Sequence, residues 1–161
     1  MKLVKFISWA IIILYLQVLV VPRLAIAGAE PNLIVPFIIF ISSMLGATSS
    51  LTISFFLGMS IDILNPELFG LNTLIYIIIS YIVIRIHPNV NKIQLTLVAL
   101  SILMLNAIYL ILFLISYFIL SYITFQFFLN MLISFIYNSI FSFAIILLLA
   151  FLDRLHFKLY D

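Results

Sequence analysis

Long apolar runs separated by short polar stretches make up most of the chain. Four of these runs, 6–22, 71–87, 93–120 and 127–152, carry no charge away from their ends. Each is at least as long as the ~17 residues that the shortest transmembrane helices need. A fifth apolar region, 33–64, is too long for one ordinary spanning helix of about 20 residues. Its middle, "SSMLGATSS", gathers small and hydroxyl residues, so the region predicts either one long helix or two short helices joined by a tight turn.

The distribution of Lys and Arg distinguishes these two possibilities, because short cytoplasmic loops are enriched in both residues. With two short helices, 31–46 and 48–64, the chain has six spans and a cytoplasmic N-terminus, and only Arg23 lies outside. The residues that then lie inside are Lys2, Lys5, Arg85, Lys92, Arg154 and Lys158. With five spans, every positive charge after Arg23 would move outside. We therefore predict one all-α integral membrane domain, 1–161, with six transmembrane helices and both termini cytoplasmic.

The N-terminal segment has a second interpretation. Its basic start, its apolar run and an A-x-A sequence at Ala25–Ala27 are also features of a cleaved signal peptide. The uncharged run is rather long for that role, and Pro22 and Arg23 lie awkwardly before the cleavage site. We therefore favour a retained first span, and the rest of the predicted topology is the same in both cases.

Composition supports a membrane protein and excludes several classes of function. Of the 161 residues, 67% are hydrophobic and only 7% are charged, and the mean hydropathy is +1.43. A soluble domain is usually about a quarter charged, so this chain lacks the polar surface that would cover a core in water. The net charge of +2 is too small and too dispersed to predict nucleic-acid binding. Because the chain has no Cys, disulfides, thiolate metal sites and a Cys nucleophile are excluded.

Potential catalytic residues are few. The two histidines, His87 and His156, are predicted at cytoplasmic edges of the membrane, and neither lies in a metal-binding spacing such as H-E-x-x-H. The chain has no Gly-rich phosphate loop and no pattern that pairs a nucleophile with a base. We therefore predict a protein that is not an enzyme and that has no catalytic residue, metal site or cofactor.

Small and polar residues recur at helical spacing in three spans. Gly46, Ser50, Ser54, Gly58 and Asp62 follow one another at intervals of four, which predicts a helix-packing seam and, as a less favoured alternative, the lining of a ligand channel. Other polar positions are the rows Asn130, Ser134, Asn138, Ser142 and Asn72, Tyr76, Ser80, and the single Asn106. An amide that faced lipid would leave its hydrogen-bonding groups unpaired. We predict that Asn72, Asn106, Asn130 and Asn138 face the interior or a partner, through interhelical hydrogen bonds or around a small-molecule cavity.

Asp62 is the most unusual of these positions, because a carboxylate within a membrane span is costly and often functional. Asn65 and Pro66 follow closely, and such residues end helices and begin turns, so Asp62 is predicted near the outer interface. There it can accept N–H groups of the turn or of the next helix, whose N-terminus carries partial positive charge. Gly70 would allow close backbone approach or a positive φ. We favour a structural clasp between the two helices over proton relay or catalysis.

The stretch "PNLIVPFIIF", followed by "GMSIDILNPELFGLNTLIYIIISYIV", resembles the rod shape-determining protein MreD family. That family's motif runs from a Pro-Asp/Asn-Leu start through Gly-x-x-x-Asp to a Gly eight residues after the Asp. The matching residues are Pro31, Asn32, Leu33, Gly58, Asp62, Gly70 and Leu74. The close match covers roughly residues 30 to 90, and elsewhere only the hydropathy agrees.

The resemblance implies a non-enzymatic scaffold of the bacterial elongation machinery in the inner membrane. Proteins of this family act with MreC, a bitopic protein with a periplasmic domain. The pair is linked to cytoplasmic MreB filaments and to the peptidoglycan polymerase and transpeptidase of sidewall synthesis. The family is also similar in fold to the substrate-binding membrane component of energy-coupling-factor transporters. A vitamin-like ligand is therefore the alternative function, and its site would lie near Glu30, Asp62, Glu67 and Asn72.

Overall fold

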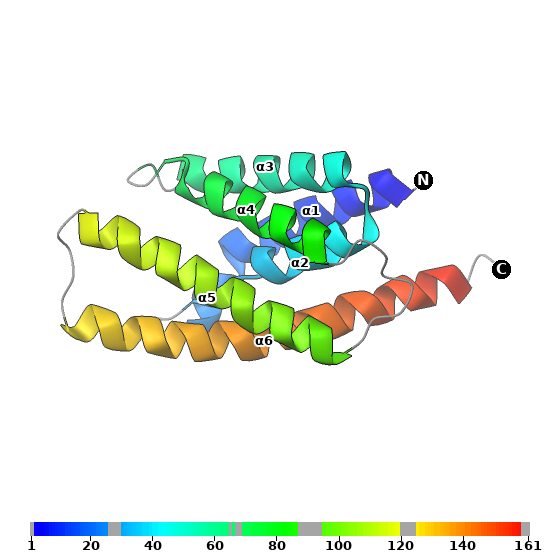
Figure 1. The fold of residues 1–161 in the computed structure, drawn as a ribbon. Coiled ribbons are helices and arrows are strands. Elements are labelled where there is room, and N and C mark those ends of the chain that lie inside the picture. Colours follow the sequence, from blue (N-terminus) through cyan, green and yellow to red (C-terminus); the bar gives the residue numbers. More distant parts are fainter. Residues whose placement is uncertain are drawn as a thin grey trace.

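The computed structural model describes residues 2–25, 30–64, 66, 69–86, 95–119 and 125–158. Every regular element within these ranges is helical. The elements are α1 (Lys2–Leu19), the 3-10 helix η1 (Val21–Leu24), α2 (Ile34–Met44), α3 (Ala47–Leu64), α4 (Leu71–Ile86), α5 (Leu95–Ile119) and α6 (Phe125–Lys158). One α-helix lies in each of the six predicted segments, so the all-helical fold is confirmed (Figure 1).

Two helix lengths differ from the predicted spans. α2 has only 11 residues, because the chain stays non-helical through Pro31 and Asn32. α6 is a single helix of 34 residues that continues beyond the predicted end at 152 to Lys158. At the first span, α1 ends at Leu19, and Pro22, which lacks a backbone N–H, lies in η1 instead.

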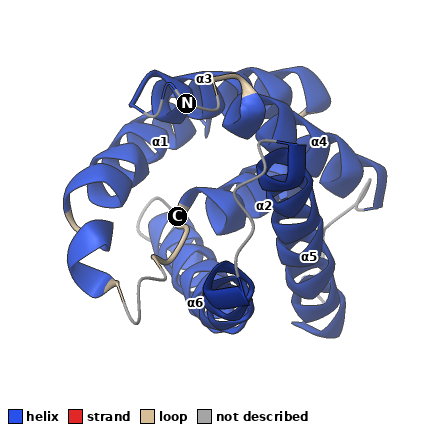
Figure 2. Cartoon of the chain, turned by 90° about the vertical axis from the view of Figure 1, so that its left-hand side faces the viewer, coloured by secondary structure: helices blue, strands red, loops and turns tan. Residues whose placement is uncertain are grey.

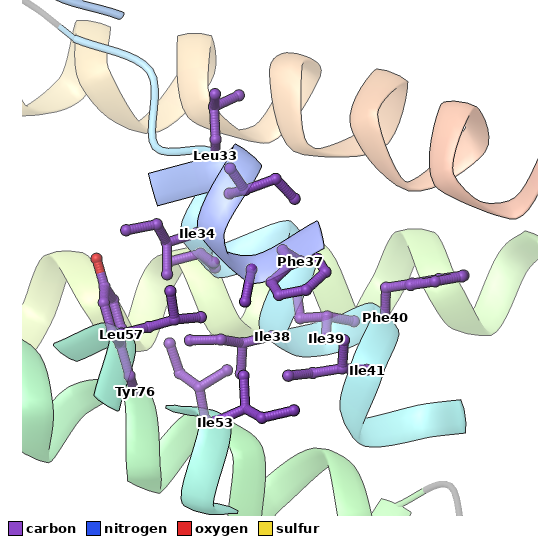
Figure 3. Packing of buried hydrophobic residues seen from close by; sticks show 14 of the residues in the cluster. Leu33, Ile34, Phe37, Ile38, Ile39, Phe40, Ile41, Ile53, Leu57 and Tyr76 are labelled. Atoms are coloured by element: carbon purple, nitrogen blue, oxygen red, sulfur yellow. The ribbon is translucent and has the colours of Figure 1, made fainter. Parts of the chain in front are cut away.

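α2 is the central helix of the bundle. Its sequence "IVPFIIFISSM" has no polar face before the two serines, and such a helix is buried on all sides. Every residue from Ile34 to Ser42 is indeed buried. Figure 2 shows α1, α3, α4, α5 and α6 arranged around it. In Figure 3, side chains of α2 such as Ile38 meet Ile53 and Leu57 of α3 and Tyr76 of α4.

A tight turn separates α2 from α3, so the prediction of two short helices rather than one long helix is correct. Leu45 has an extended conformation (φ −106°, ψ 162°), and its N–H donates to the Ile41 carbonyl at 2.8 Å. The Gly46 carbonyl then accepts the N–H of Ser50 at 3.1 Å, which starts the next helix. The chain therefore reverses direction within two residues.

α3 and α4 form a hairpin that packs more extensively than any other pair of helices, and α5 and α6 lie side by side below it (Figure 1). Both ends of the chain lie at the same end of the bundle, opposite the α3–α4 turn. Among the described residues, α3 and the stretch Leu129–Leu152 of α6 are long and apolar enough to cross a membrane. The crossing of the membrane by all six helices stays a prediction.

Candidate functional site

The Asp62 carboxylate lies at the end of α3, against the first turn of α4. Its Oδ1 accepts hydrogen bonds from the backbone N–H of Asn72 at 3.0 Å and from Asn72 Nδ2 at 3.1 Å. Its Oδ2 accepts the backbone N–H of Thr73 at 3.0 Å and the Thr73 hydroxyl at 2.5 Å. Asp62 is 0% exposed, so these four donors replace the solvent that the carboxylate has lost. We call Asp62, Asn72 and Thr73 the clasp.

The physical basis of the clasp is the structure of a helix N-terminus. The first N–H groups of a helix have no partner within the helix, and the helix dipole makes this end partially positive. Asn72 and Thr73 are the second and third residues of α4, which begins at Leu71. A carboxylate from α3 therefore pairs two unsatisfied N–H groups and places its negative charge where the dipole favours it.

The turn before α4 prepares this geometry. Gly70 has φ +89°, a conformation that L side chains rarely adopt, and its carbonyl accepts the N–H of Leu74 at 3.0 Å. Pro66 is exposed, and its carbonyl accepts the N–H of Phe69 at 3.3 Å. Asn65, a predicted motif residue, lies outside the described residues.

Gly58 lies one turn before Asp62, where the backbones of α3 and α4 come closest. A Cβ built at Gly58 would lie 2.8 Å from the backbone nitrogen of Thr73 and closer still to its Cα. Backbone atoms cannot move away as the end of a flexible side chain can. Any larger residue at this position must therefore separate the two helices, and with them the clasp.

Only part of the predicted seam, Ser50 to Gly58, is buried between helices. Ser50, Ser54 and Gly58 are buried, but Gly46 is exposed and a Cβ there would meet nothing within 4 Å. The reason is that Gly46 lies in the turn before α3, where no part of the described chain packs against it. The Ser50 hydroxyl bonds the Ile41 carbonyl at 3.3 Å, whereas the buried Ser54 hydroxyl has no hydrogen-bond partner in the described part of the chain.

A second polar cluster surrounds Asn32 at the start of α2. The side-chain oxygen of Asn32 accepts the N–H groups of Ile34 at 2.9 Å and Val35 at 3.2 Å, as an N-capping residue does. Its backbone N–H donates to Asn138 Oδ1 of α6 at 2.6 Å. Its Nδ2 donates to the Tyr76 hydroxyl of α4 at 3.3 Å.

Gln17 of α1 completes this cluster. Its Oε1 accepts the N–H of Leu33 at 2.7 Å, and its Nε2 donates to the Pro31 carbonyl at 3.3 Å. α1 and α6 therefore bind the backbone of residues 31–33, and α4 binds the Asn32 side chain, so four helices, α1, α2, α4 and α6, meet at this segment. We call Gln17, Asn32, Tyr76 and Asn138 the hub.

The remaining predicted polar positions differ in their surroundings. Asn106 of α5 is buried, and its Nδ2 lies 3.4 Å from the Ser142 hydroxyl of α6, which is a weak interhelical hydrogen bond. Ser42 and Ser80 are hydrogen-bonded at 2.9 Å between α2 and α4. Asn130 is only half-buried, near the start of α6.

Two important residues were not selected from the sequence. Gln17 is the only amide in an otherwise apolar first span, and that isolation was an available signal. For Thr73, next to Asn72, the sequence contains no such signal, because a hydroxyl in a helix most often bonds the backbone of its own helix. His87 and His156 lie where the structure does not describe side chains.

Both polar clusters join helices to one another. Both oxygens of Asp62 accept hydrogen bonds from donors of α4, and the hub amides bind backbone groups and the Tyr76 hydroxyl. Among the described residues, no group of three or more His, Cys, Asp or Glu side chains could hold a metal ion.

Comparison with known proteins gives one match. A family model described as "rod shape-determining protein MreD" matches residues 1–152, which is nearly the whole chain and includes the clasp and the hub. No curated protein and no solved structure matches the chain.

Proposed function

The chain belongs to the MreD family of rod shape-determining proteins, and from this premise we propose that it is a membrane scaffold of the machinery that elongates rod-shaped bacterial cells. MreD is a membrane protein family with a role in rod shape determination. The family match is the observation that carries the proposal, and the hydrogen bonds between helices in the clasp and the hub support it.

The partner that we propose is MreC, whose membrane segment would contact the exposed apolar surface of the bundle or its short outer loops. Large exposed hydrophobic residues occur on several outward faces, among them Val4 (67%) and Ile11 (64%) of α1 and Ile136 (61%) and Ile140 (68%) of α6. In a membrane such faces contact lipid or another helix. A link to the peptidoglycan polymerase and transpeptidase, and indirectly to MreB, would follow through MreC.

A scaffold needs a fixed shape, and the described contacts supply one. The clasp holds α3 against α4. The hub joins α1, α4 and α6 to the start of α2. We propose that this bundle lies in the bacterial inner membrane with six crossings and both termini in the cytoplasm. The expected likeness to the transporter component stays a prediction.

Co-purification tests the proposed partnership. The tagged chain is expressed with MreC from the same genome, extracted in mild detergent, and recovered through its tag. We expect MreC to be retained, and an MreC variant without its membrane segment to be lost. If full-length MreC is lost while the tagged chain remains folded, the proposed partnership is wrong.

A further inference from the structure

The length of α2 limits how far it reaches into the bilayer. With 11 residues it is about 16 Å long, whereas the 18 residues of α3 extend about 27 Å, close to the ~30 Å of a hydrocarbon core. The two helices are antiparallel, so both extend from the turn at Leu45–Gly46 toward the same side of the bundle (Figure 1). If α3 crosses the membrane, as its length and composition allow, α2 begins only about halfway across.

The hub places the start of α2 at the same depth independently. The N–H of Asn32 donates to Asn138 of α6. Asn138 lies in the middle third of Leu129–Leu152, the stretch of α6 that is long and apolar enough to span. Both α3 and α6 therefore put Asn32 deep in the membrane.

The backbone just outside α2 is not helical at this depth. Residues 30–32 form no regular element, and the polar groups at Pro31, Asn32 and Leu33 are instead paired by Gln17 and Asn138. Irregular backbone within a membrane is tolerated where protein buries it or where it lines a water-filled space. The hub explains the buried part of this segment.

Glu30 indicates where the buried part ends. It is exposed, although Pro31 beside it is buried and Asn32 is only partly exposed. A charged side chain at membrane depth faces the protein interior or water, because lipid cannot solvate it. The Tyr137 hydroxyl of α6 donates to the Leu24 carbonyl at 2.9 Å. This polar contact joins η1 to α6 at the residue next to Asn138.

We propose that the second crossing is a broken span. Its inner half is α2, and the non-helical residues 30–33 that precede α2 lie beside a water-filled indentation that opens to the outer side and reaches Glu30. Residues 26–29, which connect this segment to η1, are not described and take no part in the proposal. The proposal rests on the membrane crossing of α3 and α6 proposed above, on the depth of Asn32 and on the exposure of Glu30, but not on MreC.

Cysteine labelling tests the indentation directly, because the natural chain contains no Cys. Glu30→Cys is compared with Ile136→Cys, which lies two residues from Asn138 on α6 and is 61% exposed on the outer surface of the bundle. Phe69→Cys, 62% exposed in the turn between α3 and α4, is the control for an open surface position. Each variant is treated in spheroplasts, whose opened outer membrane admits both reagents, with a small, membrane-impermeant thiol reagent and, separately, with a bulky polyethylene glycol maleimide.

We expect the small reagent to label Glu30→Cys and Phe69→Cys but not Ile136→Cys, and the bulky reagent to label Phe69→Cys alone. Loss of all labelling at position 30, as at position 136, would show that water does not reach Glu30. Equal labelling of positions 30 and 69 by the bulky reagent would place Glu30 on an open surface. Either result overturns the proposal. Melting temperatures in detergent identify any variant that has failed to fold.

Discussion

Asp62 shows how a carboxylate can be accommodated in an apolar bundle without a cation. Four donors from two consecutive residues of α4 surround its two oxygens. Hydrogen bonds to a charged group contribute more than neutral ones, about 1.5–3 kcal/mol each before coupling between them is considered. The local sequence keeps these donors near, because only a short turn separates Asp62 from α4.

The loss of stability caused by a substitution at Asp62 should increase with the number of α4 donors that it leaves unpaired. Asp62→Asn keeps one oxygen but directs an amide group toward donors, so we expect a loss of about 1–3 kcal/mol in the free energy of unfolding. Asp62→Ala should lose more, and Asp62→Leu most, since Leu adds bulk at the turn. Melting temperature in detergent and retention of MreC should decline together.

Ser60→Ala is the matched control for this series. The Ser60 hydroxyl bonds only the Phe56 carbonyl of its own helix, at 2.8 Å, so its loss should be small. If all three Asp62 variants folded and retained MreC normally while cells lost their rod shape, Asp62 would have a chemical role and the clasp would be wrong.

Adding one methyl group at Gly58 or at Gly46 tests the close approach of α3 and α4. Gly58→Ala forces a Cβ against the backbone of Thr73, and overpacking of this kind typically costs about 1–3 kcal/mol. Gly46→Ala meets nothing within 4 Å and should leave stability unchanged or slightly higher. Thermal unfolding of the two variants under identical detergent conditions gives the comparison. A Gly58→Ala protein as stable as Gly46→Ala would contradict the close approach of α3 and α4.

At the scale of whole elements, the bundle consists of a tightly packed hairpin, α3–α4, and a second pair, α5–α6, with α2 between them and α1 packed against α2 and α3. The hub is one of the few polar connections from α6 to this centre. Asn32 is only partly exposed and Asn138 is buried, so the Asn32 N–H depends mainly on Asn138 as its acceptor. The attachment of α6 should therefore depend on Asn138 more than on the apolar residues beside it.

Asn138→Ala should weaken the contact between α6 and α2. It leaves the partly buried Asn32 N–H without its acceptor, at a cost of about 1 kcal/mol. Ser139→Ala is the neighbouring control, because the Ser139 hydroxyl bonds only the Phe135 carbonyl at 2.8 Å. Hydrogen exchange should rise in α6 and at the start of α2 in the first variant alone. Unchanged exchange in both variants would mean that the hub does not hold α6.

At the scale of the whole molecule, the arrangement of the helices constrains the topology. Both ends of the chain lie at one end of the bundle, which an even number of crossings requires (Figure 1). The positive charges of the sequence favour the cytoplasm for that end. The Lys5 ammonium lies 4.7 Å from the Trp9 ring centroid, and in the proposed topology this pair would lie at the cytoplasmic membrane boundary.

Reporter fusions should therefore place Lys92 and Asp161 in the cytoplasm and Ala29 and Glu67 outside. The reason is that positive residues are retained on the cytoplasmic side, while the α3–α4 turn lies at the opposite end. Paired reporters that are active on opposite sides of the membrane provide the measurement. A reporter at Lys92 that is active outside would remove the six-crossing arrangement.

The sequence by itself determined the features that depend on neighbours along the chain. The apolar runs gave six helices, the small residues near Gly46 marked the break between α2 and α3, and the spacing of Gly58, Asp62 and Gly70 indicated contact with α4. These features are short-range, so the local pattern contains the information. The family resemblance rested on the same residues, and the match over residues 1–152 confirmed it.

Only the tertiary structure decided which apolar segments are buried and which distant residues meet. Asn32 and Asn138 are separated by 106 positions, and Gln17 reaches the same backbone from another helix. α2 lies in the centre although α5, which lies outside it, is almost as apolar. The physical reason is that a membrane protein is apolar both inside and toward lipid, so hydropathy does not distinguish its core from its surface. Packing and the pairing of a few polar groups make that distinction.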